Sequence, residues 1–120
     1  MAQNPFLGLS CRFDTGKPSR RRGAAMRMFL KVQMEVEAAN RAIKDGSMPK
    51  IVQGFMETAK PEGAWFTALD GKRTMVAVFD LPSTAHIPPL MEPFFTGLNA
   101  TIELSPAMDA ADLQAGLSNL

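Results

Sequence analysis

Few side chains in this sequence could act as an acid or a base. His86 is the only histidine, and because a free imidazole titrates near neutral pH, it could serve as a general acid or base. Glu103 could act as a base if it were removed from water. No set of Asp, His or Cys side chains accompanies His86 at metal-ligand spacing, so we expect no metal there. The alternative for His86 is an ordinary exposed histidine.

Four polar residues alternate with apolar ones in two segments that resemble strands. Lys31 and Gln33 lie in the first of these segments, and Thr101 and Glu103 lie in the second. If the two strands are neighbours, Lys31 and Glu103 could together orient a polar ligand in a half-dry cleft. The alternative is a cross-strand ion pair that only satisfies its own two charges.

One arginine and several aromatic residues are further candidates for ligand binding. Arg73 could hold a carboxylate through two parallel hydrogen bonds, although its place near a turn is equally typical of a solvated residue. Aromatic side chains could line a pocket, but core packing explains the same spacing. The candidate ligand-binding residues are Phe29, Lys31, Gln33, Trp65, Phe66, Arg73 and Thr101.

Several classes of chemistry have no motif here. The sequence has no P-loop, no G-x-G-x-x-G and no H-E-x-x-H, which argues against nucleotide-driven and zinc-hydrolase chemistry. The single cysteine, Cys11, excludes an intramolecular disulfide and a cysteine-based zinc knuckle. No apolar run approaches the roughly 20 residues that span a bilayer. We therefore expect a cytoplasmic protein with no cofactor, no metal and no membrane partner.

The first 25 residues differ in composition from the rest. They contain five basic residues and one acid, whereas residues 26–120 contain eight basic and eleven acidic residues. We interpret residues 1–25 as a disordered basic tail and residues 26–120 as one folded domain. The run Ser19–Arg22 could contact phosphates, but a single basic run is weak evidence, so association with nucleic acid through this tail is only a third and weaker hypothesis. Another interpretation is that translation starts at Met26 or Met28, with the upstream stretch added by cloning or by the choice of gene start.

Hydrophobic periodicity divides residues 26–120 into strands and helices. Alternation predicts strands over residues 28–34 and 100–105, and Asp70-Gly71 predicts the turn of a hairpin over residues 62–80. Apolar stripes at spacings of three and four predict helices. These helices cover residues 35–45, 47–60 with Ser47 as the cap, 87–98 and 109–117. Pro93 should kink the third helix or make it begin late.

The order of these elements predicts an α+β fold. It corresponds to the ferredoxin-like βαββαβ arrangement, a four-stranded antiparallel sheet with helices on one face, followed by a short helix. Leu30, Val32, Ile102 and Leu104 should lie under the helices. The opposite side of the hairpin is also largely apolar, so we expect a second copy of the chain to cover it.

Parts of the sequence resemble the dimeric α+β barrel superfamily, and within it the muconolactone isomerase-like group. The segments that carry the resemblance are Met28–Val32 and Val78–Ser83, and Asn40–Gly46 followed by Pro49 is similar to small uncharacterised bacterial proteins. The resemblance extends over about 90 residues and implies a homodimer with two sheets packed face to face. It implies no single activity, because the superfamily includes antibiotic-biosynthesis monooxygenases, haem-binding members and stress-response proteins.

These observations lead to a hypothesis about function. We expect a homodimer that binds a small organic metabolite in the cleft between sheet and helices. If the protein is catalytic, Glu103 and His86 are the candidate catalytic residues of a cofactor-free isomerase that acts on lactone-like or aromatic-breakdown compounds. The alternatives are a non-enzymatic ligand-binding or stress-response module and a cofactor-independent monooxygenase. The sequence leaves open whether the chain is an enzyme.

Overall fold

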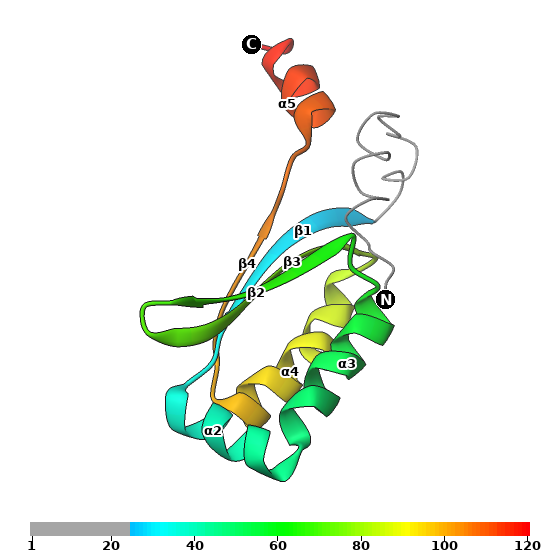
Figure 1. Cartoon of the computed structure of the whole chain (residues 1–120). Coiled ribbons are helices and arrows are strands. Elements are labelled where there is room, and N and C mark those ends of the chain that lie inside the picture. Colours follow the sequence, from blue (N-terminus) through cyan, green and yellow to red (C-terminus); the bar gives the residue numbers. More distant parts are fainter. Residues whose placement is uncertain (1–24) are drawn as a thin grey trace.

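The computed structural model describes residues 25–120 of the chain (Figure 1). The predicted tail therefore lies outside the described residues except for Ala25, and so do Cys11 and the run Ser19–Arg22. Within the described range, no helix has the length and apolar character needed to cross a membrane.

Four antiparallel strands form one sheet in the order β2-β3-β1-β4. The strands are β1 (Met26–Gln33), β2 (Gly63–Leu69), β3 (Lys72–Leu81) and β4 (Thr101–Pro106). The α+β class and the antiparallel sheet agree with the prediction, and the strand order is compatible with a ferredoxin-like arrangement.

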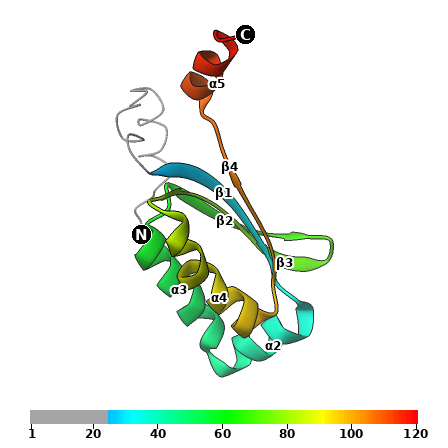
Figure 2. The same cartoon turned by 180° about the vertical axis from the view of Figure 1, so that it is seen from behind.

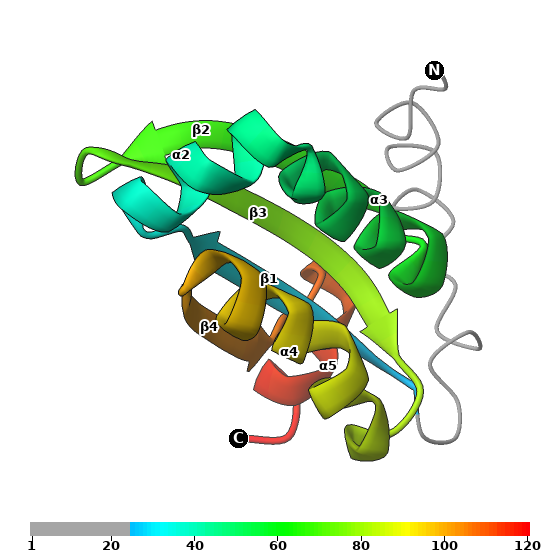
Figure 3. The same ribbon diagram turned by 90° about the horizontal axis from the view of Figure 1, so that it is seen from below.

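Three helices pack on one face of this sheet, as Figure 3 shows from below. They are α2 (Val36–Asp45), α3 (Ser47–Ala59) and α4 (Ile87–Leu98), with a short 3₁₀ turn, η2 (Thr84–His86), before α4. A further helix, α5 (Ala110–Leu117), follows β4 and lies on the opposite side of the sheet from α3 and α4 (Figures 1 and 2). The ends of α2, α3, α4 and α5 lie within one residue of the ranges that their apolar stripes predicted.

Two details of the helix starts differ from the prediction. Gly46, and not Ser47, is the N-cap of α3, because Gly46 also ends α2 with a φ of 82° and leaves Ser47 as the first helical residue. Of the two effects expected of Pro93, a kink or a late start, the late start is wrong, since α4 begins at Ile87 and continues through Pro93. The other two prolines of α4, Pro88 and Pro89, lie in its first turn, where backbone N–H groups have no partner within the helix in any case.

The hairpin between β2 and β3 has the predicted register. Trp65 lies opposite Val76, and the turn residues Asp70 and Gly71 have φ values of 55° and 74°. Positive φ at both positions is typical of a type I′ turn, whose twist matches that of the paired strands. This register fixes which side chains of β3 face the helices, and it therefore places Arg73 on the helix side of the sheet.

The core lies between the sheet and the three helices. Phe79 and Phe94 are fully buried, and the ring of Phe55 packs edge to face against both, with centroid distances of 5.6 and 5.7 Å. Leu30 and Val32 are also fully buried, as predicted. The core thus occupies only one face of the sheet.

Candidate functional site

The nine predicted site residues fall in three places. Six lie on the sheet face opposite α2, α3 and α4, which we call the front face; they are Phe29, Lys31, Gln33, Trp65, Thr101 and Glu103. Phe66 and Arg73 lie on the helix side of the hairpin. His86 lies apart from both groups, in η2.

A row of side chains crosses the front face from β2 to β4. The register places Trp65 opposite Val76, Val76 opposite Lys31, and Lys31 opposite Glu103. Lys31 and Glu103 are therefore neighbours, as predicted, although among the described residues no ion pair joins them. Trp65 is 39% exposed and Phe29 is 36% exposed, so the front face presents aromatic surface to solvent.

The Trp65 side chain lies back along its own strand. A Cβ atom at Gly63 would be 2.6 Å from the Trp65 ring. The indole therefore covers the backbone at Gly63, and only glycine leaves room for it there. This contact holds the ring against the front face.

Gln33 has a structural role on the front face. Its Nε2 donates to the carbonyl oxygen of Leu69 at 3.1 Å and to Oδ2 of Asp70 at 3.3 Å. The side chain thus reaches across β3, where the opposite residue Thr74 is only 2% exposed. The Gln33 amide ties the hairpin turn to β1, and its hydrogen-bond donors are used within the chain.

The two candidate catalytic residues do not come together. His86 is exposed just before α4, with Nδ1 3.3 Å from the carbonyl oxygen of Ser83. Glu103 is exposed in the middle of β4 on the front face. In residues 25–120, no group of three or more His, Cys, Asp or Glu side chains could hold a metal ion. Within a single chain, His86 and Glu103 therefore cannot act at one reaction centre.

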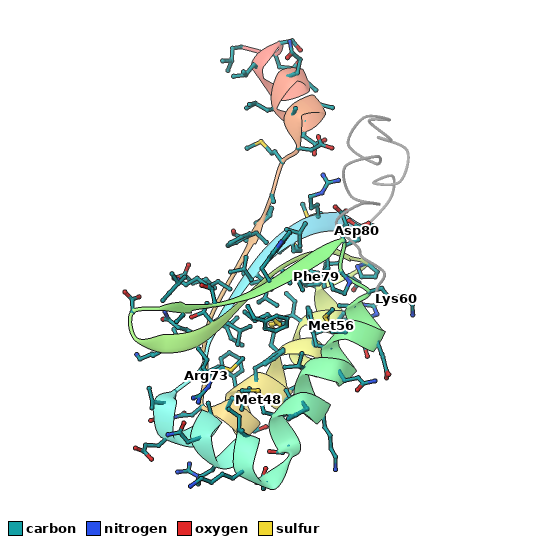
Figure 4. The ribbon with its side chains drawn as sticks, in the orientation of Figure 1. Met48, Met56, Lys60, Arg73, Phe79 and Asp80 are labelled. Atoms are coloured by element: carbon teal, nitrogen blue, oxygen red, sulfur yellow. The ribbon has the colours of Figure 1, made fainter. Side chains whose placement is uncertain are left out.

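An apolar recess lies on the helix side of the hairpin, and we call it the α3 groove. It has a volume of about 380 Å³. Its lining residues are Met34, Met48, Val52, Phe66, Thr67, Arg73 and Thr74. Figure 4 shows Arg73 and Met48 between the hairpin and the helices. Among these lining residues, Arg73 is the only one with an ionisable side chain.

The guanidinium of Arg73 is oriented by α2. Its Nη1 donates to Oδ1 of Asn40 at 3.0 Å. Asn40 is neutral, and no carboxylate of the described residues forms an ion pair with Arg73. Because a guanidinium has five N–H donors, this single bond leaves others for a ligand. The groove thus combines an oriented cation with an apolar wall.

Helix α3 contributes two different apolar stripes. Met48 and Val52 line the α3 groove, and Met56 continues the same stripe one turn later. Ile51 and Phe55 lie on the side that meets the core, and Met48 and Met56 also pack against the core from the groove side. Sequence periodicity does not separate these stripes, because both are apolar at helical spacing. The groove residues of α3 were for this reason not predicted as site residues.

A second depression, of about 360 Å³, lies between α3 and α4. Its lining residues are Lys50, Ile51, Gly54, Phe55, Thr58, Pro89, Leu90 and Pro93. In the part of the chain that the structure describes, no side-chain hydrogen bond orients Lys50 or Thr58. This depression has the size of a ligand site but lacks a fixed polar group.

A buried ion cluster lies near the start of β1. Arg27 is 7% exposed, and its Nε lies 3.5 Å from Oε2 of Glu62. Its Nη1 lies 3.3 Å from Asp109 and 3.5 Å from Asp112. The two aspartates form the capping box of α5. Arg27 therefore links the sheet to the start of α5, a role that the sequence did not indicate.

Searches against models of protein families, curated proteins and solved structures found no match to this chain. Interpretation of the α3 groove and the front face therefore depends on their own residues. The groove is a recess with an oriented charge, whereas the front face is an exposed surface with aromatic and charged residues.

Proposed function

We propose that this chain binds a small organic molecule in the α3 groove. The observation that carries the proposal is the recess of about 380 Å³ in which an apolar wall meets one oriented guanidinium. Small-molecule sites are typically concave and mostly apolar, with a few placed polar groups and volumes of roughly 300–1,000 Å³. The α3 groove has these properties, and it lies between sheet and helices.

The geometry favours binding over catalysis. A general base must lie within hydrogen-bond reach of the proton that it removes. Glu103 and His86, the candidate catalytic residues, do not line the α3 groove. We therefore propose a ligand-binding protein, rather than a lactone isomerase or a monooxygenase, as the function to test first.

Equilibrium dialysis with a neutral apolar compound, N-phenyl-1-naphthylamine, tests this function. Val52→Trp would place an indole in the α3 groove and should lower the affinity by about tenfold or more. Thr58→Trp is the matched control, because Thr58 is exposed on the same helix and lines only the second depression. Circular dichroism checks that both variants fold. Unchanged affinity in Val52→Trp would contradict the proposal, and a loss in Thr58→Trp alone would assign the ligand to the depression between α3 and α4.

We also propose that a second copy of the chain covers the front face. Val76 and Val78 are half-buried in the middle of this face, between the exposed rings of Phe29 and Trp65. Helix α5 lies on the same side of the sheet (Figure 1), and several apolar side chains on and beside it are exposed. These are Leu113 and Leu117, with Met108 and Leu120 beside the helix. Exposed apolar side chains gathered on one side of a molecule are typical of an interface.

The charges on the front face are also self-complementary. Lys31 and Glu103 lie side by side, with opposite signs. In a two-fold dimer the same patch occurs on both partners, so Lys31 of each copy can face Glu103 of the other. Two sheets packed in this way correspond to the arrangement implied by the resemblance to dimeric α+β barrels.

A further inference from the structure

A further hollow adjoins each end of the α3 groove. At one end Arg73 is shared with a hollow of about 240 Å³ that also touches Lys44 of α2. At the other end Val52 and Phe66 are shared with a more open hollow of about 530 Å³ that reaches Met56. The three hollows adjoin one another at these shared residues, and we call this trough-like row the extended groove.

The two ends of the extended groove differ in charge. Arg73 and Lys44 lie at one end, and in the described residues neither has a carboxylate partner. At the other end lies Glu57, whose Oε2 accepts a hydrogen bond from Gln53 at 3.0 Å. The first end therefore attracts an anionic head group more strongly than the second, where the ammonium of Lys60 lies beside Glu57 and offsets its charge. The trough favours a ligand with one negative end and one apolar end.

The size of the trough and the type of cation define this ligand further. A guanidinium presents parallel N–H groups that match the two oxygens of a carboxylate. From Met48 to Met56 the helix advances about 12 Å at 1.5 Å per residue, which gives room for an extended apolar tail. Methionine side chains are unbranched and adaptable, so they can pack against tails of different shape.

We propose that the extended groove binds amphipathic monocarboxylic acids, with the carboxylate on Arg73 and the apolar tail along α3 towards Met56. This inference names the ligand class of the proposed function and rests on it. Asn40 is a positioning residue in this arrangement, because its side chain holds the guanidinium without neutralising it.

Isothermal titration calorimetry with octanoate and 1-octanol separates the head group from the tail. The wild-type chain should bind octanoate about tenfold or more tighter than 1-octanol, because hydrogen bonds between charged groups are the stronger ones. Arg73→Met keeps the apolar stem and removes the charge. It should lower the affinity for octanoate about tenfold or more and leave that for 1-octanol within about twofold. Lys72→Met is the matched control, because this exposed neighbouring cation does not line the groove and should change neither affinity.

A second variant tests the positioning role. Asn40→Ala should weaken octanoate binding by less than Arg73→Met does and should leave 1-octanol binding unchanged, since only the orientation of the guanidinium is lost.

Three results would overturn the inference alone, provided that the naphthylamine still binds. They are equal wild-type affinities for octanoate and 1-octanol, an equal loss of both in Arg73→Met, and no binding of octanoate at all. Failure of all three compounds to bind the wild-type chain would overturn the proposed function as well.

Discussion

Glu35 connects β1 to α2 and caps the helix with its side chain. Its carboxylate accepts hydrogen bonds from the backbone N–H groups of Ala38 at 2.8 Å and Glu37 at 3.2 Å. These bonds, and above all the one from Ala38, hold the pKa of Glu35 below its usual value of 4.5. Because this pKa is lower in the folded than in the unfolded chain, Glu35 stabilises the fold above pH 4.5, and the contribution disappears as the pH falls through the folded pKa.

We therefore expect Glu35→Gln to lower the melting temperature at pH 7 by a few degrees and to have a progressively smaller effect as the solution is acidified below pH 4.5. Thermal unfolding followed by circular dichroism between pH 3 and pH 7 measures this difference. Glu92→Gln, on the exposed side of α4, is the control and should show no such dependence on pH. A difference between Glu35→Gln and wild type that is the same at all pH values would show that the charge of Glu35 has no part in capping.

Residue type alone identified Arg73 as a group suited to carboxylates, but not the residue that orients it. Asn40 lies 33 residues away in the sequence, and an asparagine on a helix has no pattern that marks it as a partner of an arginine on a strand. Glu103 and His86 show the opposite case. Their types suggested acid–base chemistry, but the fold gives them separate positions. The sequence shows which residue types could do chemistry, whereas the contacts between distant side chains depend on how the helices and strands pack.

At the level of elements, strong local signals predicted most of the structure. Asp70-Gly71 defined the hairpin, because few other dipeptides adopt two positive φ values so readily, and the pairing that follows is the observed one. The neighbourhood of Lys31 and Glu103 followed from strand order. The start of α4 was predicted less well, because a proline inside a helical pattern usually interrupts the helix, whereas Pro93 lies on the exposed side of α4 and the helix continues through it.

The link between β1 and α5 could not be predicted, because it depends on a buried arginine between elements at the two ends of the described chain. We expect Arg27→Met to lower the free energy of unfolding by about 3 kcal/mol, since it removes a buried guanidinium that lies beside the largely buried carboxylates of Glu62 and Asp109. Urea unfolding measures this change. Hydrogen exchange in α5 should also become faster, because its capping box loses the contact with the sheet.

Two further variants control this prediction. Arg41→Met removes an exposed arginine from α2 and should change the stability by less than about 0.5 kcal/mol. Arg27→Lys should recover only part of the stability, because a single ammonium cannot contact separate carboxylates as a guanidinium does. If the α5 amides exchanged at the wild-type rate in the Arg27→Met variant, the ion cluster around Arg27 would not be what holds α5 to the sheet.

For the whole molecule, the two proposals concern opposite sides of the sheet. The α3 groove lies on the helix side and is complete within one chain. The front face and α5 lie on the other side (Figure 1), and both expose apolar residues to solvent. A monomeric variant should therefore still bind the ligand. If the pocket were instead shared between the sheets of two copies, loss of the dimer would also abolish binding.

We expect the protein to have twice the 13.0 kDa mass of one chain in analytical ultracentrifugation at micromolar concentration. Phe29→Glu should weaken this dimer by about a hundredfold or more, because two-fold symmetry places the added charge in the interface twice. Phe95→Glu is the matched control, since Phe95 is 44% exposed on α4, on the helix side, and should leave the dimer intact. The Phe29→Glu monomer should still bind octanoate with wild-type affinity. A wild-type chain that sediments as a monomer would disprove the dimer, and loss of octanoate binding in a folded Phe29→Glu monomer would show that the groove depends on the second copy.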